Sequence, residues 1–294
     1  MSRFNYRLIM FIAVSFFSNS LMSQDEEPKN TAKKISDSSF VALSLNYISD
    51  AIFMGRRDSI SAPYLYSTLM YHYKSGFYAS GAVSYLTRAN EGRVDLFLLT
   101  GGFDFTIKKL NGDLSFTTYF FNEDSYNVIS EVSTDFTALL EYDFNLINLG
   151  LSASSYFSND SNSDFFLSSE VSHDFITNDN KFQFSPTIGM SFGSQNFYEQ
   201  YYINNRFGNG RGQGQGSSNT LQSTMVELTE SERFNLMAIE MSLPIWYIHK
   251  SFGAVIVPSY VIPQNGATLS FNDELVEEDL DNTFYFIVGI TYMF

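Results

Sequence analysis

The chain has 294 residues, and its 17 lysines and arginines against 32 aspartates and glutamates give a net charge of −15 at pH 7. This negative charge argues against binding to nucleic acid, which depends on neutralising phosphates. The absence of cysteine excludes disulfides, thiol catalysis and thiolate metal sites. Aromatic residues nevertheless make up 17% of the chain, so the fold must place many rings away from water.

Residues 1–23 have the layout of a secretory signal peptide. Arg3 and Arg7 precede an apolar run from Leu8 to Phe17, and small and polar residues follow. The apolar run is too short to cross a bilayer as a helix, which takes about 20 residues. We therefore expect an exported protein that is cleaved before Gln24. Residues 24–37 are polar and without periodicity, which predicts a flexible periplasmic leader.

From residue 38 onward, large apolar side chains alternate with small or polar ones. In "FVALSLNY", residues 40–47, the alternation has a period of two, which places the two sets on opposite faces of a strand. The same pattern predicts about twelve strands, near residues 38–48, 62–74, 76–87, 93–107, 113–122, 126–144, 147–158, 164–177, 181–193, 233–248, 252–262 and 283–294. Strands of about 10 residues match a tilted crossing of a bilayer.

The connections between these strands alternate in length. Tight turns are expected near residues 74–76, 109–113, 145–147, 177–181 and 249–252, and Asn111-Gly112 is a hairpin signal. Longer loops are expected at residues 49–61, 88–92, 123–125, 159–163, 194–232 and 263–282. This asymmetry, with both ends of the predicted barrel on the short-turn side, is typical of an outer-membrane barrel.

The predicted fold class is therefore all-β, a transmembrane antiparallel up-and-down β-barrel of about 12 strands that covers residues 38–294. A sheet in lipid cannot leave an unpaired edge, so it must close. The alternative is a secreted soluble β-sandwich or barrel, whose strands also alternate. In that alternative the apolar face would be the inner one.

The last strand carries the first resemblance to a known class. Val288, Ile290, Tyr292 and Phe294 share one face of the segment "TFYFIVGITYMF". This segment resembles the C-terminal β-signal of Gram-negative outer-membrane proteins. The resemblance implies recognition by the barrel-assembly machinery and a place in the cell outer membrane, in contact with its lipid.

A second resemblance lies at the start of the predicted barrel. The segments "YISDAIFMGRRDS" and "SGFYASGAVSY" are similar to the opening of a family of porin-like outer-membrane proteins, in which a strand runs into an aromatic-x-Arg-Gly loop. Here the order is Gly55-Arg56-Arg57, which departs from that pattern. The resemblance implies a porin-like channel for small polar solutes, and the leader has the style of a Bacteroidetes-type bacterium.

If the apolar face meets lipid, the lumen receives the polar face and its carboxylates. The candidate lumen-lining acids are Asp104, Glu131, Asp135, Glu141, Asp143, Glu170, Asp174 and Glu240. Such a wall would favour cations. Alternatively these acids pair with lumen-facing arginines or lysines or simply line water, because twelve strands enclose a bore that side chains can nearly fill.

Two loops carry further candidates. Arg56 and Arg57 in the first long loop are predicted to fold inward as a constriction facing the acids, to contact lipopolysaccharide phosphates at the rim, or to be exposed. The Gly-rich segment within residues 194–232 predicts a mobile lid, a plug or a docking surface for a protein partner.

A lipid-cleaving barrel enzyme would need a nucleophile and a base within hydrogen-bond reach on one face. The chain has a His-x-Ser pair at His249 and Ser251, but it falls in a predicted turn. We therefore expect no catalytic site, no cofactor and no metal. Two functions are left: a porin-like channel for small polar solutes, with cation preference as a further hypothesis, and a non-conducting barrel that docks a partner through residues 194–232.

Overall fold

The computed structural model describes residues 38–58, 60–158, 163–201, 226–229, 233–266, 268–271, 274–277 and 280–294. The predicted signal peptide, the predicted leader and most of the Gly-rich segment lie outside the described residues and stay predictions. In the part of the chain that is described, no helix is both long and apolar enough to cross a bilayer.

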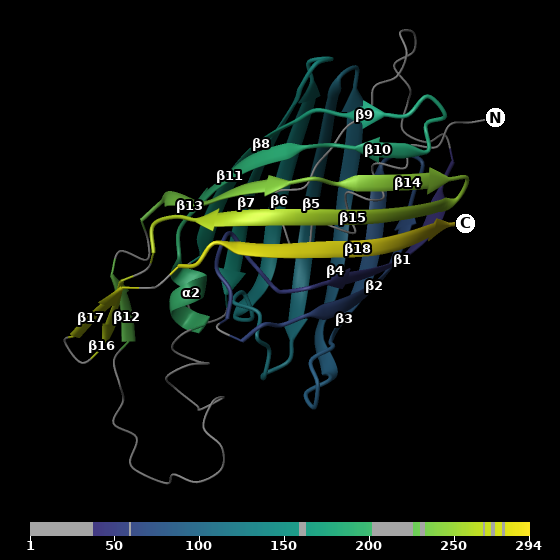
Figure 1. Cartoon of the computed structure of the whole chain (residues 1–294). Helices are drawn as coiled ribbons and strands as arrows, with labels where there is room; N and C mark the ends of the chain where they lie inside the picture. The colour runs from purple at the N-terminus through teal and green to yellow at the C-terminus, as the bar shows by residue number, and fades with distance from the viewer. Residues whose placement is uncertain are drawn as a thin grey trace.

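The strands form one antiparallel sheet that closes into a barrel (Figure 1). The wall consists of β1 (Phe40–Ile48), β2 (Tyr64–His72), β3 (Phe77–Leu86), β4 (Arg93–Ile107), β5 (Leu110–Phe121), β6 (Val132–Asp143), β7 (Asn148–Ser158), β8 (Asp164–Ser172), β11 (Thr187–Gly193), β13 (Asn235–Ser242), β15 (Phe252–Pro263) and β18 (Thr283–Met293). Each pairs with its neighbour, β13 pairs with β15, and β18 pairs with β1 to close the ring. The predicted barrel of twelve strands is confirmed.

Three of these strands continue after a break. The short strands β9 (Phe175–Ile176), β10 (Phe182–Phe184) and β14 (Ile245–His249) extend β8, β11 and β13. Pro186 and Pro244 lie in two of the breaks, where a residue without an N–H cannot continue the ladder. Each interrupted pair therefore counts as one wall strand.

The remaining described elements lie at one end of the barrel. Figure 1 shows the helix α2 (Asn196–Tyr201) and a separate sheet of β12 (Val226–Thr229), β16 (Thr268–Phe271) and β17 (Glu274–Glu277) at the end opposite the C-terminus. We call this the loop end. The other end carries the tight turns and is called the turn end.

The wall is apolar outside and largely polar inside. On β2, Leu69 and Tyr71 are exposed on the outer face, whereas Thr68 and His72 are buried inside. Large exposed rings gather on the outer face near both ends, as aromatic girdles do at the two bilayer interfaces, and include Tyr71, Phe77, Phe182 and Tyr292 at the turn end and Phe97, Phe120, Phe157 and Phe284 at the loop end. The soluble alternative required the opposite arrangement of the two faces.

Two details of the predicted strands were wrong. The β4–β5 turn is Lys108-Lys109, because Ile107 pairs with Leu110. The expected turn residue Gly112 lies inside β5 opposite Phe105, whose ring covers it so closely that a Cβ there would lie 2.2 Å from a ring atom. The strand expected over residues 126–144 begins only at Val132, and its register shifts between Val132 and Thr134.

Gly76 in the β2–β3 turn gives a stability prediction. Its φ is +99°, and a Cβ there would lie 2.2 Å from the carbonyl oxygen of Asp104. We expect Gly76→Ala to lower the free energy of unfolding by more than about 1 kcal/mol, since the new side chain meets both strain and backbone. Urea unfolding of refolded protein would measure this. Gly101→Ala on β4 is the control, because no atom lies within 4 Å of its Cβ position, and equal losses in the two variants would contradict the argument.

Candidate functional site

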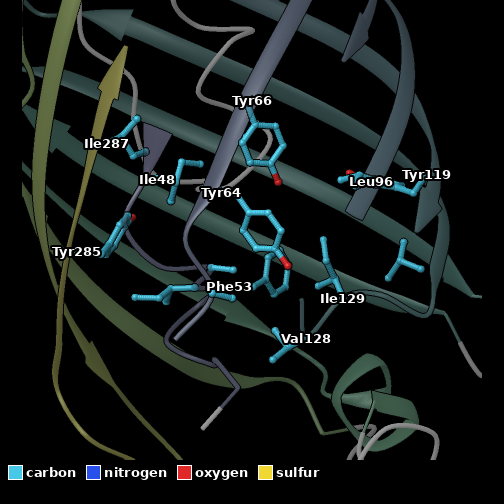
Figure 2. Close-up of a cluster of buried hydrophobic side chains, with 14 of the residues drawn as sticks. Ile48, Phe53, Tyr64, Tyr66, Leu96, Tyr119, Val128, Ile129, Tyr285 and Ile287 are labelled. Carbon is cyan, nitrogen blue, oxygen red and sulfur yellow. The ribbon is translucent and has the colours of Figure 1, made fainter. Parts of the chain in front are cut away.

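The loop half of the barrel interior contains an apolar cluster (Figure 2). Its members come from inward positions of the wall, from the β1–β2 connection, from the loop before β6 and from α2. The non-wall members are Ala51, Ile52, Phe53, Ala62, Val128, Ile129, Phe197 and Tyr201. Together with the hairpin tip Met54–Arg56, we call these residues the inner plug. Figure 2 shows Phe53, Val128 and Ile129, which belong to the same cluster as the inward residues Tyr64 and Tyr66.

The tip of the inner plug is a two-residue hairpin. The N–H groups of Phe53 and Arg56 each donate to the other's carbonyl at 2.8 Å. Met54 and Gly55 both have positive φ, 47° and 80°, as a type I′ turn requires. Gly55 is also needed for space, since a Cβ there would lie 2.9 Å from the Pro263 Cβ. The tip therefore packs closely against the wall.

Phe53 lies at the centre of an aromatic cluster inside the barrel. Its ring centroid lies 5.6 Å from that of Tyr156, 5.3 Å from that of Phe166 and 5.2 Å from that of Phe197. The last two contacts are edge-to-face, which is a favourable geometry for rings. Phe53 thus joins the β1–β2 connection to β7, β8 and α2.

Arg56 is fully buried at 0% exposure. Its guanidinium donates to the carbonyls of Met237 at 2.7 Å, Gln264 at 2.9 Å and Asn265 at 2.7 Å. A further donation reaches Gln195 Oε1 at 3.3 Å. Arg56 has folded inward, and these acceptors are three backbone carbonyls and one side-chain amide. At this depth it cannot reach lipopolysaccharide phosphates, so that prediction is wrong for Arg56.

Arg57 has a different environment from Arg56. Its side chain is 36% exposed and donates to Asp50 Oδ2 at 3.1 Å. Asp50 also accepts from the backbone N–H groups of Ala51 and Ala62, at 3.0 and 2.8 Å. Arg57 and Asp50 thus lie at the base of the inner plug, where Asp50 ties the two ends of the connection together.

Three of the predicted acids form one row across the inner wall. Glu141 pairs with Gly150, Gly150 with Glu170, Glu170 with Gly189, and Gly189 with Glu240. Glutamates on β6, β8 and β13 therefore alternate with glycines on β7 and β11. A Cβ at Gly150 would lie 2.7 Å from the Glu170 Cγ, so the glycine makes room for the long acid beside it. We call Glu141, Glu170 and Glu240 the glutamate row.

The other predicted acids are distributed differently. Asp104, Asp135 and Asp174 are buried on the inner face. Asp135 accepts from the Tyr119 hydroxyl at 2.7 Å, and Asp174 accepts from Gln183 Nε2 at 3.1 Å. Asp143 ends β6 at the turn end, and Glu131 is half-buried in the loop before β6 rather than on a strand. Glu131 therefore does not share the inner face of β6 with Asp135.

Sequence reasoning missed an acid pair and a histidine near the turn end. Asp113 lies directly opposite Asp104 on the neighbouring strand. His72 Nε2 lies 2.6 Å from Asp104 Oδ2, and the Tyr78 hydroxyl donates to Asp113 Oδ1 at 3.2 Å. Asp113 had been placed in a turn, yet its alternation with Leu114 was a usable signal.

The wall strands carry very few cationic side chains. In the twelve described wall strands, Arg93 is the one residue of lysine or arginine type, and its Nε donates to Asp95 Oδ1 at 3.1 Å at the loop end. The pairing of the predicted acids with lumen-facing lysines or arginines stays an open alternative. Within the described ranges, no three His, Asp or Glu side chains are grouped so that they could hold a metal ion.

No protein-family model and no curated protein matches this chain. Among solved structures, it is similar to the NanC porin (TM-score 0.48, 12% identity, 86% of this chain and 98% of that chain). It is also similar to an outer membrane channel from Pseudomonas putida F1 (TM-score 0.47, 9% identity, 91% and 100%) and to LpxR from Salmonella typhimurium (TM-score 0.45, 11% identity, 86% and 100%). Similarity at this level decides nothing about activity, and the barrel fold rests on the strand pairing described above.

Proposed function

We propose that the chain is an outer-membrane channel for small polar solutes, with a preference for cations. The observation that carries the proposal is the closed wall with its apolar outer face and its acidic inner face. A closed sheet leaves no unpaired backbone edge, as a strand crossing of lipid requires. The polar inner face would then line a path for small polar solutes, which the hydrocarbon of a bilayer does not offer.

The outer face of the last strand supports the same location. Val288, Ile290, Tyr292 and Phe294 are all exposed on it. β18 pairs with β1 from Ile287 to Met293 and so completes the barrel. This arrangement suits a final strand that the barrel-assembly machinery would recognise during insertion, with outer-membrane lipid, including lipopolysaccharide, around the wall. Export by residues 1–23 is part of the same proposal.

The cation preference follows from the glutamate row. Glu141, Glu170 and Glu240 lie on every second strand of the inner face, and Arg93 is the one lysine or arginine of the twelve described wall strands. Fixed carboxylates with low-dielectric walls around them attract cations and repel anions. Small cationic or neutral polar solutes fit this lining best.

Planar-bilayer recording of refolded protein tests the proposal. We expect single-channel openings and, in a salt gradient, a reversal potential of the sign that cation selectivity gives. Replacing the glutamate row with glutamines should lower the cation-to-anion permeability ratio by roughly threefold or more, since it removes three charges from the path.

Asp179→Asn is the matched control, because Asp179 is exposed in the turn between β9 and β10 and pairs there with Lys181. Its selectivity should equal that of the wild type. Unchanged selectivity in the glutamine variant would contradict the cation preference. The proposed channel function would be contradicted if neither the wild type nor a variant with a destabilised inner plug showed any opening.

The inner plug favours a second candidate, a non-conducting barrel that docks a partner. Phe53 and Arg56 fill part of the loop half of the lumen. In a non-conducting barrel this obstruction would be permanent. The partner would bind the segment 194–232, of which α2 and β12 are described. The same recordings separate the two candidates.

A further inference from the structure

We propose that Arg56 is a latch that holds the inner plug inside the barrel, and that the channel opens when the Phe53–Arg56 hairpin leaves its seat. This inference rests on the proposed channel function and adds its gate. The latch is defined by the contacts of one guanidinium with three separate parts of the chain.

The first part is the wall itself. Arg56 donates to the carbonyl of Met237 on β13 at 2.7 Å. The same carbonyl accepts from the backbone N–H of Gln264 at 2.7 Å, so it belongs to a fixed junction between β13 and the end of β15. A guanidinium bound there is held by the paired strands of the barrel wall.

The second part is the connection after β15, and the third is the segment before α2. The carbonyls of Gln264 and Asn265 accept from Arg56 at 2.9 and 2.7 Å, and Gln195 Oε1 accepts at 3.3 Å. The planar fork of arginine can reach several acceptors at once, which an ammonium group cannot do in the same geometry. Removing Arg56 would thus release three segments together.

The latch has two well-separated positions because a buried guanidinium is tolerated only where acceptors converge. Charged groups are costly to bury without partners. In its present seat Arg56 has the four acceptors named above, and outside the barrel it would have water. A guanidinium that left the seat without reaching water would lose these acceptors, so the hairpin is expected to behave as a two-state element.

The base of the connection is fixed while its tip is held by the latch. Asp50 accepts from the N–H groups of Ala51 and Ala62 and from Arg57. The Tyr201 hydroxyl of α2 donates to Asp58, which follows the hairpin in the chain. The tip can therefore swing about a clamped base, and its movement is linked to α2.

Arg56→Gln tests the latch. It keeps one amide donor group and loses the charge and the fork, so we expect the open probability in planar bilayers to rise by about tenfold or more, which corresponds to about 1.4 kcal/mol. Arg56→Lys should lie between wild type and Arg56→Gln. The matched control is Lys181→Gln, which removes an exposed cation that pairs with Asp179 in the turn between β9 and β10 and should leave the open probability unchanged.

A second readout does not depend on ion current. The chain has no cysteine, so a cysteine introduced for Ser80, which is buried on the inner face of β3, would be the only thiol. We expect a small cationic thiol reagent to label it about tenfold faster in the Arg56→Gln background than with Arg56 present. Heat-dependent migration in detergent gels would show that each variant is folded.

A disulfide lock provides the reverse test. A Cβ at residue 55 would lie 3.3 Å from the Ala238 Cβ, close to the usual disulfide separation of about 3.5–4.5 Å. In Gly55→Cys with Ala238→Cys, oxidation should abolish openings and reduction should restore them. The reduced form controls for the strain of a side chain at positive φ.

The outcomes separate the latch from the channel. If wild type conducts and Arg56→Gln neither opens more often nor labels faster, or if the oxidised lock still conducts, the latch is wrong and the channel stands. If Arg56→Gln labels faster but no variant conducts, the latch stands and the channel is wrong. If no variant conducts or labels, both are wrong.

Discussion

Replacing Leu99 with arginine is expected to lower the free energy of unfolding in a lipid bilayer by about 2–4 kcal/mol, the cost of a cationic side chain facing the bilayer midplane. Leu99 lies near the middle of β4, between Arg93 and Ile107, and its side chain is 48% exposed on the outer face. Urea unfolding of protein inserted in vesicles would measure the loss. Trp246, the one tryptophan of the chain, reports on the wall from β14.

Ile107→Arg is the matched control for this prediction. Ile107 is an exposed outer residue of the same strand, but it lies beside the Lys108-Lys109 turn. An arginine there can reach the interface, so the expected loss is about 0–1 kcal/mol. Equal losses at the two positions would mean that the outer face of β4 does not lie in hydrocarbon, and the proposed membrane location would fail with it.

The barrel could be predicted from the sequence because the wall strands share one pattern, the alternation of apolar with small or polar residues. Each strand has one face toward the outside of the barrel and one toward the lumen, so residues such as Leu43 and Ser44 on β1 alternate with a period of two. Once the sheet is assumed to close in a membrane, the alternation also predicts which residues face outward and which face the lumen. The predicted acids Glu141, Glu170 and Glu240 fall on the inner face for this reason.

The exact turns were less predictable because packing can outweigh local preference. Asn111-Gly112 is a strong hairpin dipeptide. In the structure, the ring of Phe105 covers Gly112, and the turn moves to Lys108-Lys109. A cross-strand ring contact of this kind depends on the pairing register, which the local sequence does not specify.

The inner plug could not have been predicted from periodicity. The segment from Ala51 to Phe53 has no alternation, and its partners are far away in the chain. Arg56 bonds to carbonyls 181 and 208 residues later, at Met237 and Gln264. Backbone carbonyls leave no side-chain signal in the sequence, so Arg56 could be selected as a candidate while its seat could not be found.

Phe53→Ala is expected to release the inner plug without unfolding the wall. The ring packs on Phe166 and Phe197 with centroid distances of 5.3 and 5.2 Å, and removing such a buried ring costs about 3–5 kcal/mol. That loss falls on the hairpin and α2, because the wall strands pair with one another independently of the plug. The backbone N–H groups of Phe53 and Arg56 bond each other's carbonyls, so their hydrogen exchange reports on the hairpin directly.

We expect the amide of Arg56 and that of residue 53 in Phe53→Ala to exchange at least about a hundredfold faster than in wild type, while amides of the wall strands keep their rates. Phe165→Ala is the matched control, since Phe165 precedes Phe166 on β8 but is exposed on the outer face. Its hairpin amides should exchange as in wild type, because it removes a ring of the same size that does not touch the plug. If Phe53→Ala speeds exchange in the wall and the hairpin equally, plug and wall form one cooperative unit. A plug of that kind cannot leave its seat while the barrel stays folded, and neither the latch nor a gated channel would then be possible.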